Sequence, residues 1–514
     1  MRRYAFLFLL LAGILTLFCA CDSTETPYYQ LTFVYGNDTP DLVVTKPEEV
    51  PAAPQQEGLR FLRWLDENDD PMEIRDIRHL PKGTVKTFYA QWEELERLIE
   101  EEDGLGFTTQ LPILYINTAG AQAPESKTEY LNGLFTIEGA GKEDRSNEPI
   151  RIRARGNFTY DFCEKKAYRI KFETPVSLFG CGKNRDYVLL ADYLDPSHLK
   201  NYAAYTMAKE LGSMEYAPLA QQVCVVLNGK FTGLYLLSQH TEVAGDKIDI
   251  KMDTTGRTQV PFFVEMDDYA AREGTEGVDY FSVYDDRNRR NIHFVIKYPE
   301  NPTSAQFQYI KQYVKDALNA CRDRQSGTWT NYFDADSLID YFLINQLMLN
   351  GEIVYKSVFF SKSLDGKIKM GPVWDFDWGI GGPICYYDPY CKQNYGTNYY
   401  KGDHFDGTSV SVKNWCGNIF YDALLKNSLF CSTLKARFTK VAPKLQKVID
   451  SLPEAYEGIR YEANWDIYVW NRFAYAPEAT RTTSPYVTPD YQANLVYELL
   501  NKRMAWMKNV IPKL

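Results

Sequence analysis

The chain has 514 residues with a formal charge of -11 at pH 7, and 45% of its residues are hydrophobic. This length predicts two or three domains with a large apolar core. The acidic balance and the lack of a basic run argue against nucleic-acid binding. Only 5 histidines occur and no HExxH motif is present, which argues against a zinc hydrolase.

Residues 1–20 have the layout of a secretory signal, because Arg2 and Arg3 precede an apolar run that ends in small residues. The ending Phe-Cys-Ala-Cys resembles a bacterial lipobox and predicts lipidation of Cys21. An uncleaved anchor helix is the alternative, since the run is nearly long enough to span a membrane. Residues 21–27 read as a polar tether. We therefore expect an extracytoplasmic protein that is lipid-anchored to a bacterial membrane or cell surface.

Residues 28–93 form a small unit of alternating, aromatic-rich strands with polar turns between them. Its matching features are the early LTFVYGN strand, the FLRW segment and the closing YAQW segment. The unit resembles the internalin-type Listeria–Bacteroides repeat, which implies a β-rich, β-grasp-like spacer or adhesion module without catalysis. Residues 94–107 then read as an acidic, partly helical linker.

Residues 108–514 predict one large α+β domain. Asn228-Gly229 marks a hairpin between two apolar strands, and Asp195 and Gly212 are candidate ends of a helix whose first helical residue is Pro196. Beyond Ile380 the chain has no period and is rich in Tyr, Cys and Asn, which indicates a lid or an insertion. Further expected elements are strands at 150–162, 165–172, 221–230, 231–239 and 262–269, and helices near 304–321, 334–349 and 493–511.

Cys385 and Cys391 lie within that stretch, close enough in one loop to pair. Export permits disulfides, but a chain of this size does not need them for stability.

Two aspartates, Asp375 and Asp377, follow a predicted β-hairpin that turns at Asp365-Gly366. If the strand extends through them, their carboxylates share one face and need a cation or a basic side chain between them. Upstream, Glu352 lies in a loop after a helix, and Ser357 follows five residues later. Phosphotransferases of the protein-kinase type use this order, with a loop carboxylate for the acceptor hydroxyl and an aspartate for Mg²⁺. The alternative is that Asp377 caps a turn and Asp375 pairs with an arginine.

Lys166 alternates in phase with the apolar positions of its predicted strand, so we expect a buried ammonium that pairs with a carboxylate and with phosphate. A strand-end lysine that reaches solvent along its stem is the alternative. Arg155 belongs to a stripe of three arginines before Gly156-Asn157, which reads as a phosphate-facing hairpin or as a solvated stripe.

Six segments, in order over about 400 residues, resemble the CotH family of spore-coat atypical protein kinases. They are RGNFTYDFCEKKAYRIKF, LLADYLDPSHLKNYAAYTMAKELG, VVLNGKFTGLYLLS, FFVEMD, YFLINQLMLNGE and MGPVWDFDWGIGG. The resemblance implies a remote kinase-like fold that binds ATP with Mg²⁺ or Mn²⁺ and phosphorylates serine on proteins. It implies that Lys166 contacts nucleotide phosphates, that Asp375 holds metal, and that Glu352 takes the place of the acidic residue in the Asn-x-Asp loop.

Three positions depart from the family pattern. Glu352 replaces an aspartate, Ser357 replaces an asparagine that helps to hold metal, and Gln239 replaces a glutamate that pairs with the lysine. Glu242 or Glu265 could take over that pairing. The expected site therefore contains Glu352 and Asp375 as catalytic residues. Lys166, Arg155 and Gln239 are expected on the nucleotide, and Asp375, Ser357 and Asp377 on the metal.

The sequence supports three functions. The first is a surface-anchored kinase that transfers phosphate from Mg-ATP to Ser or Thr of an exported or surface protein. The second is a non-catalytic surface protein that binds a partner or glycan, with the Tyr-rich stretch beyond Ile380 as one contact surface. The third is a metal-dependent glycosyltransferase built around Asp375 and Asp377, which leaves Lys166 and Glu352 without roles.

Overall fold

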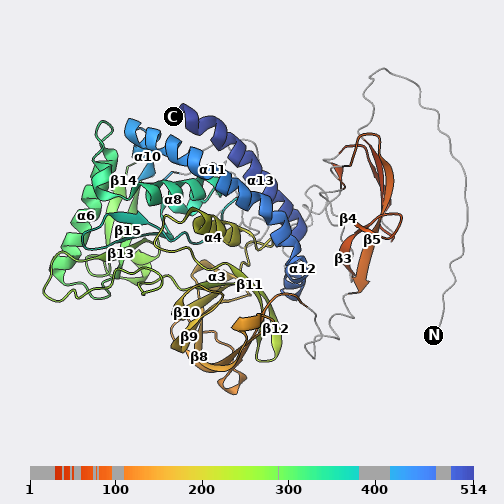
Figure 1. The fold of residues 1–514 in the computed structure, drawn as a ribbon. Helices are drawn as coiled ribbons and strands as arrows, with labels where there is room; N and C mark the ends of the chain where they lie inside the picture. The colour runs from red at the N-terminus through yellow and green to blue at the C-terminus, as the bar shows by residue number, and fades with distance from the viewer. Residues whose placement is uncertain are drawn as a thin grey trace, which may run out of the picture. The chain divides into compact units, whose positions relative to one another are not determined.

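The chain divides into two compact units, residues 1–96 and 97–514, in the computed structural model (Figure 1). The predicted signal, Cys21, the tether, most of the linker, and Cys385 and Cys391 lie outside the described residues. Among the described helices, none has the length and apolar character needed to cross a membrane. The described residues are 29–36, 40–46, 49–50, 59–72, 77, 80–94, 109–286, 289–380, 417–470 and 488–514.

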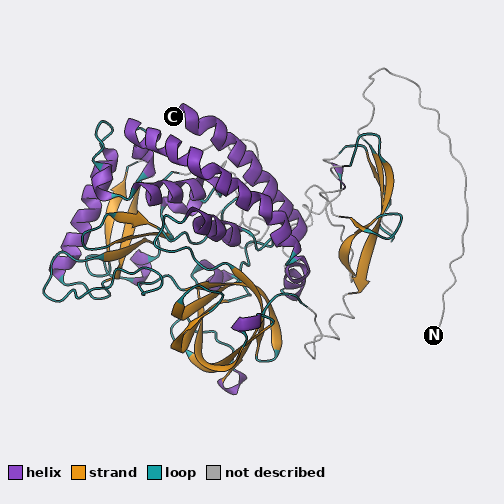
Figure 2. Cartoon of the chain, viewed as in Figure 1, coloured by secondary structure: helices purple, strands orange, loops and turns teal. Residues whose placement is uncertain are grey.

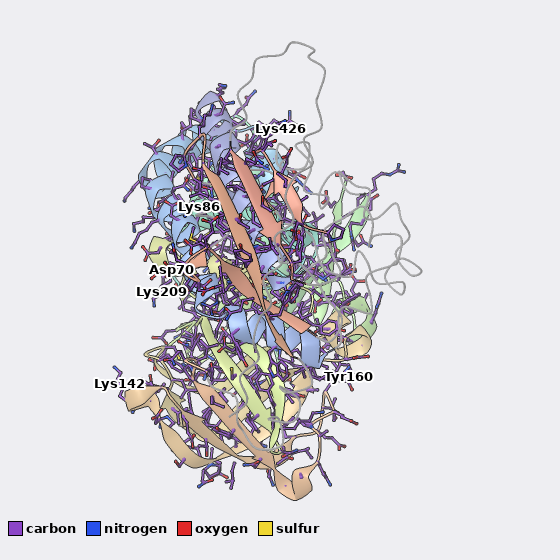
Figure 3. All side chains as sticks on the ribbon, turned by 90° about the vertical axis from the view of Figure 1, so that its right-hand side faces the viewer. Asp70, Lys86, Lys142, Tyr160, Lys209 and Lys426 are labelled. Atoms are coloured by element: carbon purple, nitrogen blue, oxygen red, sulfur yellow. The ribbon has the colours of Figure 1, made fainter. Side chains whose placement is uncertain are left out.

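The first unit is a five-stranded sheet with the order β2-β1-β5-β3-β4, in which β1 and β5 run parallel. Its core includes Phe33 and Trp64, whose ring centroids lie 4.8 Å apart edge to face. Lys86 on β5, labelled in Figure 3, pairs with Asp66 at 3.6 Å. The strands are β1 (Gln30–Val34), β2 (Leu42–Val44), β3 (Leu59–Leu65), β4 (Pro71–Met72) and β5 (Val85–Glu94). Membership of the Listeria–Bacteroides repeat stays a prediction.

The second unit begins with a closed seven-stranded barrel, in the order β10-β12-β11-β6-β7-β8-β9, seen at the lower part of Figure 1. The β6–β11 pair is parallel and the other pairs are antiparallel. Alternating side chains fill the interior, as a half-buried strand requires. The strands are β6 (Ile113–Thr118), β7 (Leu131–Glu138), β8 (Arg145–Arg155), β9 (Ala167–Ser177), β10 (Lys183–Leu190), β11 (Gln221–Leu227) and β12 (Lys230–Gln239).

A second, antiparallel sheet with the order β14-β15-β13-β16-β17 packs with most of the helices around one hydrophobic core. In Figure 2 the helices form a layer above the barrel, and α6 flanks this sheet. The unit is therefore α+β, as predicted. The strands are β13 (Phe262–Met266), β14 (Tyr280–Asp285), β15 (Arg290–Tyr298), β16 (Val358–Lys362) and β17 (Ile368–Met370).

The helical layer is built on α4 and α8, which contact each other and the long helix α11; α13 packs on α11, and α12 contacts strand β12 of the barrel. The α-helices are α3 (Phe158–Phe162), α4 (Lys200–Leu211), α5 (Ala270–Glu273), α6 (Ser304–Arg322), α7 (Trp329–Tyr332), α8 (Ala335–Leu347), α10 (Tyr421–Leu424), α11 (Ser428–Glu457), α12 (Arg460–Val469) and α13 (Pro489–Val510). The short 3-10 helices are η3 (Ala119–Ala121), η4 (Gly141–Glu143), η5 (Gly351–Val354) and η10 (Ile511–Lys513).

Several local signals are confirmed. Asn228 and Gly229 have φ of 54° and 79° and join β11 to β12, as a two-residue hairpin with left-handed residues requires. Gly212 ends α4 with φ of 67°. The hairpin at Asp365-Gly366 joins β16 to β17.

Four predicted boundaries are wrong. Helix α4 begins at Lys200 rather than at Pro196, although the Asp195 carboxylate still accepts the Lys200 N–H at 2.9 Å. The strand that contains the arginine stripe ends at Arg155, because the chain turns into α3. Strand β17 ends at Met370, so Asp375 and Asp377 lie in an irregular segment, and α13 starts four residues earlier than expected.

Candidate active site

A cavity of about 150 Å³ lies where the barrel faces the helical layer of the second unit. Its wall combines carboxylates, two basic residues and several aromatic rings, so it suits a charged ligand with a flat part. The lining comes from residues 155–159 around the start of α3, Ala167 of β9, residues 190, 191, 192 and 194 at and after the end of β10, Asn201 and Tyr205 of α4, residues 265, 267 and 269 around the end of β13, residues 356–357, and residues 374, 375, 377 and 378.

Asp375 and Ser357 meet at this cavity. The Ser357 hydroxyl donates to Oδ2 of Asp375 at 2.9 Å, and the Asn350 amide donates to the Asp375 carbonyl at 3.4 Å. Asp375 has φ of 65° and Ser357 has φ of 55°, a left-handed conformation that non-glycine residues rarely adopt. Because this conformation is unfavourable for both residues, the surrounding structure must hold the pair in place.

Asp377 turns away from Asp375 toward helix α4. Its Oδ1 accepts a hydrogen bond from the Asn201 amide at 2.5 Å, and the same amide donates to Asp192 at 2.8 Å. The side-chain oxygen Oδ1 of Asn201 accepts the Phe376 N–H at 2.9 Å. The prediction that both aspartates lie on one strand face is therefore wrong, since the segment is not a strand. Burial raises the pKa of Asp377 to about 7, and the Asp375 charge adds to this.

Glu352 lies behind Lys356, which lines the cavity. Its Oε1 is 2.6 Å from the Lys356 ammonium, and its Oε2 has no hydrogen-bond partner among the described residues. Burial raises the pKa of Glu352 well above its usual value; Lys356 opposes this and Asp375 adds to it. Burial disfavours the Lys356 ammonium, but Glu352 and Asp375 outweigh burial and raise its pKa. Sequence reasoning missed Lys356, although it immediately precedes Ser357.

Arg155 is the second basic residue of the cavity wall, and its guanidinium lies 5.6 Å from the centre of the Trp374 ring. Burial lowers the pKa of Arg155, while the Asp375 carboxylate opposes this change. The other two arginines of the stripe lie over the ring of Tyr130 instead, Arg151 at 5.4 Å and Arg153 at 5.2 Å. The stripe therefore divides between the cavity and the outer surface of the barrel.

Lys166 does not line the cavity. Its ammonium donates to the carbonyls of Tyr160 and Cys163, both at 2.7 Å, so it closes the C-terminal end of α3; Tyr160 is labelled in Figure 3. The expected pairing with a carboxylate is wrong, because β9 begins only at Ala167 and its alternation does not extend back to residue 166.

Gln239 also lies outside the cavity wall. Its amide donates to the Cys181 carbonyl at 3.2 Å, and its side-chain oxygen accepts the Leu219 N–H at 2.7 Å. The two acids considered as substitutes have other partners: Glu242 pairs with Lys247 at 2.7 Å, and Glu265 pairs with Lys297 at 3.0 Å. The structure thus gives Gln239 a role in holding backbone rather than nucleotide.

The neighbouring Lys165 is the buried lysine that sequence reasoning sought. Its ammonium is 2.6 Å from Asp466 of α12 and donates to the carbonyls of Ala191 and Leu234 at 2.8 and 2.5 Å. Both charged side chains are 0% exposed. Gly233 is required here, because a Cβ atom at that position would lie 2.1 Å from Asp466. The pair joins the barrel to the helical layer.

The residues present can help to hold a hard cation but cannot enclose one. Across the described ranges, no three His, Cys, Asp or Glu side chains form a group that could hold a metal ion. Mg²⁺ usually keeps several waters and takes one or two carboxylates plus substrate phosphates. Asp375, which accepts a side-chain hydrogen bond from Ser357, fits that lesser demand. The cysteines in the described ranges belong to no such group either: Cys163, Cys181, Cys224, Cys321 and Cys431.

Comparison with known proteins gives one result for this domain. A family model described as CotH kinase protein matches residues 152–507, which is more than half of the chain. The match covers Arg153 and Arg155 of the stripe, the whole cavity wall and most of the helical layer. A search of curated proteins finds no match.

Proposed function

The chain belongs to the CotH kinase protein family, and we propose that it is an atypical protein kinase that transfers phosphate from Mg-ATP to Ser or Thr of an exported protein. The observation that supports this most is the meeting of Asp375, Ser357 and Lys356 at one cavity, with Glu352 paired to Lys356 behind the wall. These residues come from the loop and the hairpin end where a kinase-type site has its acceptor and metal groups.

Each residue has a proposed role. A divalent cation, when bound by Asp375 with Ser357 beside it, neutralises charge on the phosphates of ATP. Arg155 and Lys356 supply positive charge from two other parts of the wall. Lys356 occupies Oε1 of Glu352, which leaves Oε2 to accept a hydrogen bond from the acceptor hydroxyl.

The transfer itself forms one bond and breaks one. The acceptor oxygen bonds to the γ-phosphorus, and the bond from that phosphorus to the bridging oxygen of ADP breaks. The acceptor proton passes to Glu352, whose raised pKa suits it to take a proton. The raised pKa also means that Lys356 and the bound cation must keep part of the Glu352 population ionised.

The second candidate is a pseudokinase that binds a partner or a glycan. Two observations favour it: Glu352 pairs with Lys356, and two of the three expected nucleotide residues, Lys166 and Gln239, bind backbone instead. Under either candidate we propose anchoring at the cell surface through Cys21, with the exported acceptor or partner meeting the cavity there.

Autophosphorylation of the chain from residue 22 with labelled ATP and Mg²⁺ or Mn²⁺ separates these functions. We expect label on the wild type, none on Asp375→Ala, and wild-type label on Asp365→Ala, a control at the exposed β16–β17 turn. Mg-ATP at a hundredfold over its dissociation constant should also raise the free energy of unfolding by about 2.7 kcal/mol. No label and no stabilisation would rule out the kinase and leave the pseudokinase.

A further inference from the structure

Tyr205 on α4 is a buried tyrosine whose hydroxyl group does not contribute a hydrogen bond to the described part of the fold. Its side chain is 0% exposed, and its ring stacks on Trp374 with centroids 5.7 Å apart and planes at 18°. It lines the cavity, yet its hydroxyl has no hydrogen-bond partner among the described residues. A buried hydroxyl without a partner destabilises the fold, so packing alone would favour phenylalanine here.

The charged groups that act on this hydroxyl all belong to the same cavity. Burial raises the pKa of Tyr205 well above its usual value, and Asp375, Asp192 and Asp377 raise it further, while Arg155 opposes them. The phenol therefore keeps its proton at neutral pH and can act as a hydrogen-bond donor. Because the ring is fixed between α4 and Trp374, the direction of the hydroxyl is set before a ligand binds.

We propose that Tyr205 binds the nucleotide by donating its hydroxyl hydrogen bond to a phosphate oxygen. This inference rests on the proposed function, since it is Asp375 with its cation that brings the phosphates of ATP to this part of the wall. A phosphate oxygen is charged, so the bond is of the stronger, charge-assisted kind. Losing it should weaken binding by about tenfold or more.

The test compares Tyr205→Phe with Tyr421→Phe. Tyr421 is also buried, but its hydroxyl donates to the Leu338 carbonyl at 2.9 Å and it does not line the cavity. Calorimetry would measure the affinity for Mg-ATP and for Mg-tripolyphosphate, and thermal unfolding would measure stability without ligand. We expect Tyr205→Phe to lose affinity for both ligands by about tenfold at unchanged or higher melting temperature, whereas Tyr421→Phe loses stability and keeps both affinities.

The possible outcomes separate the two hypotheses. A wild type that does not bind Mg-ATP would overturn the proposed function and the Tyr205 donor together. A wild type that binds Mg-ATP equally with Tyr205→Phe would overturn the donor alone. Loss of ATP affinity with no change for tripolyphosphate, or a wild type that binds no tripolyphosphate, would overturn the assignment to phosphate.

Discussion

Two groups of buried charge in the second unit differ in how completely their atoms are paired. The Lys165 ammonium has a carboxylate and two carbonyl partners within hydrogen-bond distance. By contrast, the Tyr205 hydroxyl in the cavity wall, and Oε2 of Glu352 behind Lys356, have no hydrogen-bond partner among the described residues. A buried polar group without a partner is unfavourable. The fully paired first group therefore stabilises the fold, whereas the incompletely paired second group is best explained as a place where a ligand binds.

Removing Lys165 should give the largest loss of stability. Lys165→Met leaves the buried Asp466 charge unpaired, which should lower the free energy of unfolding by about 3–5 kcal/mol. Lys166→Met is the control, because it removes only carbonyl contacts at the end of α3 and should cost about 1 kcal/mol. Urea unfolding of both variants checks the comparison. Equal losses of unfolding free energy in the two variants would show that the Lys165–Asp466 pair stabilises the fold no more than the carbonyl contacts of Lys166 do.

Removing the carboxylate of Asp375 should act on activity rather than on stability. Asp375→Asn keeps the shape and the Ser357 contact but removes a charge, so phosphate transfer should fall about a hundredfold or more. The melting temperature without ligand should stay the same or rise, because the residue has left-handed backbone and like-charged neighbours. Labelled-ATP kinetics and thermal unfolding measure the two effects separately. If the variant has a lower melting temperature but a normal rate of phosphate transfer, Asp375 contributes to stability, as Lys165 does, and not to activity.

Asn201 lines the cavity beside the segment that carries Asp375, and its loss should show an intermediate effect. Its side-chain amide N–H donates to Asp192 and Asp377. Its side-chain oxygen Oδ1 accepts the N–H of Phe376, the residue directly after Asp375. Asn201→Ala should misplace Asp375 and lower kcat about ten- to a hundredfold, with a higher Mg²⁺ requirement. Half-saturation by Mn²⁺, followed by its electron spin resonance signal, checks the metal effect without turnover. If kcat and Mn²⁺ binding are unchanged in folded protein, Asn201 is not a positioning residue.

The sequence predicted the elements that depend on local chemistry and missed what depends on distant contacts. Both hairpins formed where Asn228-Gly229 and Asp365-Gly366 predicted them, and at Asn228-Gly229 the residues suit the left-handed turn that they form. Asn201 could not be found this way, since its partner Phe376 is 175 residues away.

The two adjacent lysines show the same limit. Alternation predicted Lys166 to be buried, but the phase of a strand applies only within that strand, which starts at Ala167. Which lysine is buried depends on Asp466, about 300 residues later in α12, and no local pattern reports that contact. The sequence thus indicated which types of side chain lie near the site, but it did not indicate the directions in which those side chains point.

His240, just after β12, should have a smaller effect on stability, and this effect should depend on pH. Burial lowers the pKa of His240 well below its usual value, and the positive charges of Arg169, Arg155 and Lys247 lower it further. Below about pH 6.5 the unfolded chain takes up a proton that the folded chain refuses, so stability falls as the pH falls. The loss is at most about 1.4 kcal/mol for each pH unit until the folded pKa is reached.

The check is urea unfolding of the wild type and His240→Gln at several pH values between 5 and 8. Other groups that titrate in this range, such as Asp377 with its pKa of about 7, are present in both proteins. The difference between the two proteins should therefore isolate the histidine, with His240→Gln losing less stability as the pH falls. Parallel curves would mean that His240 takes up its proton in the folded chain. The positive charges around it would then be compensated by nearby acids, as Lys165 is by Asp466.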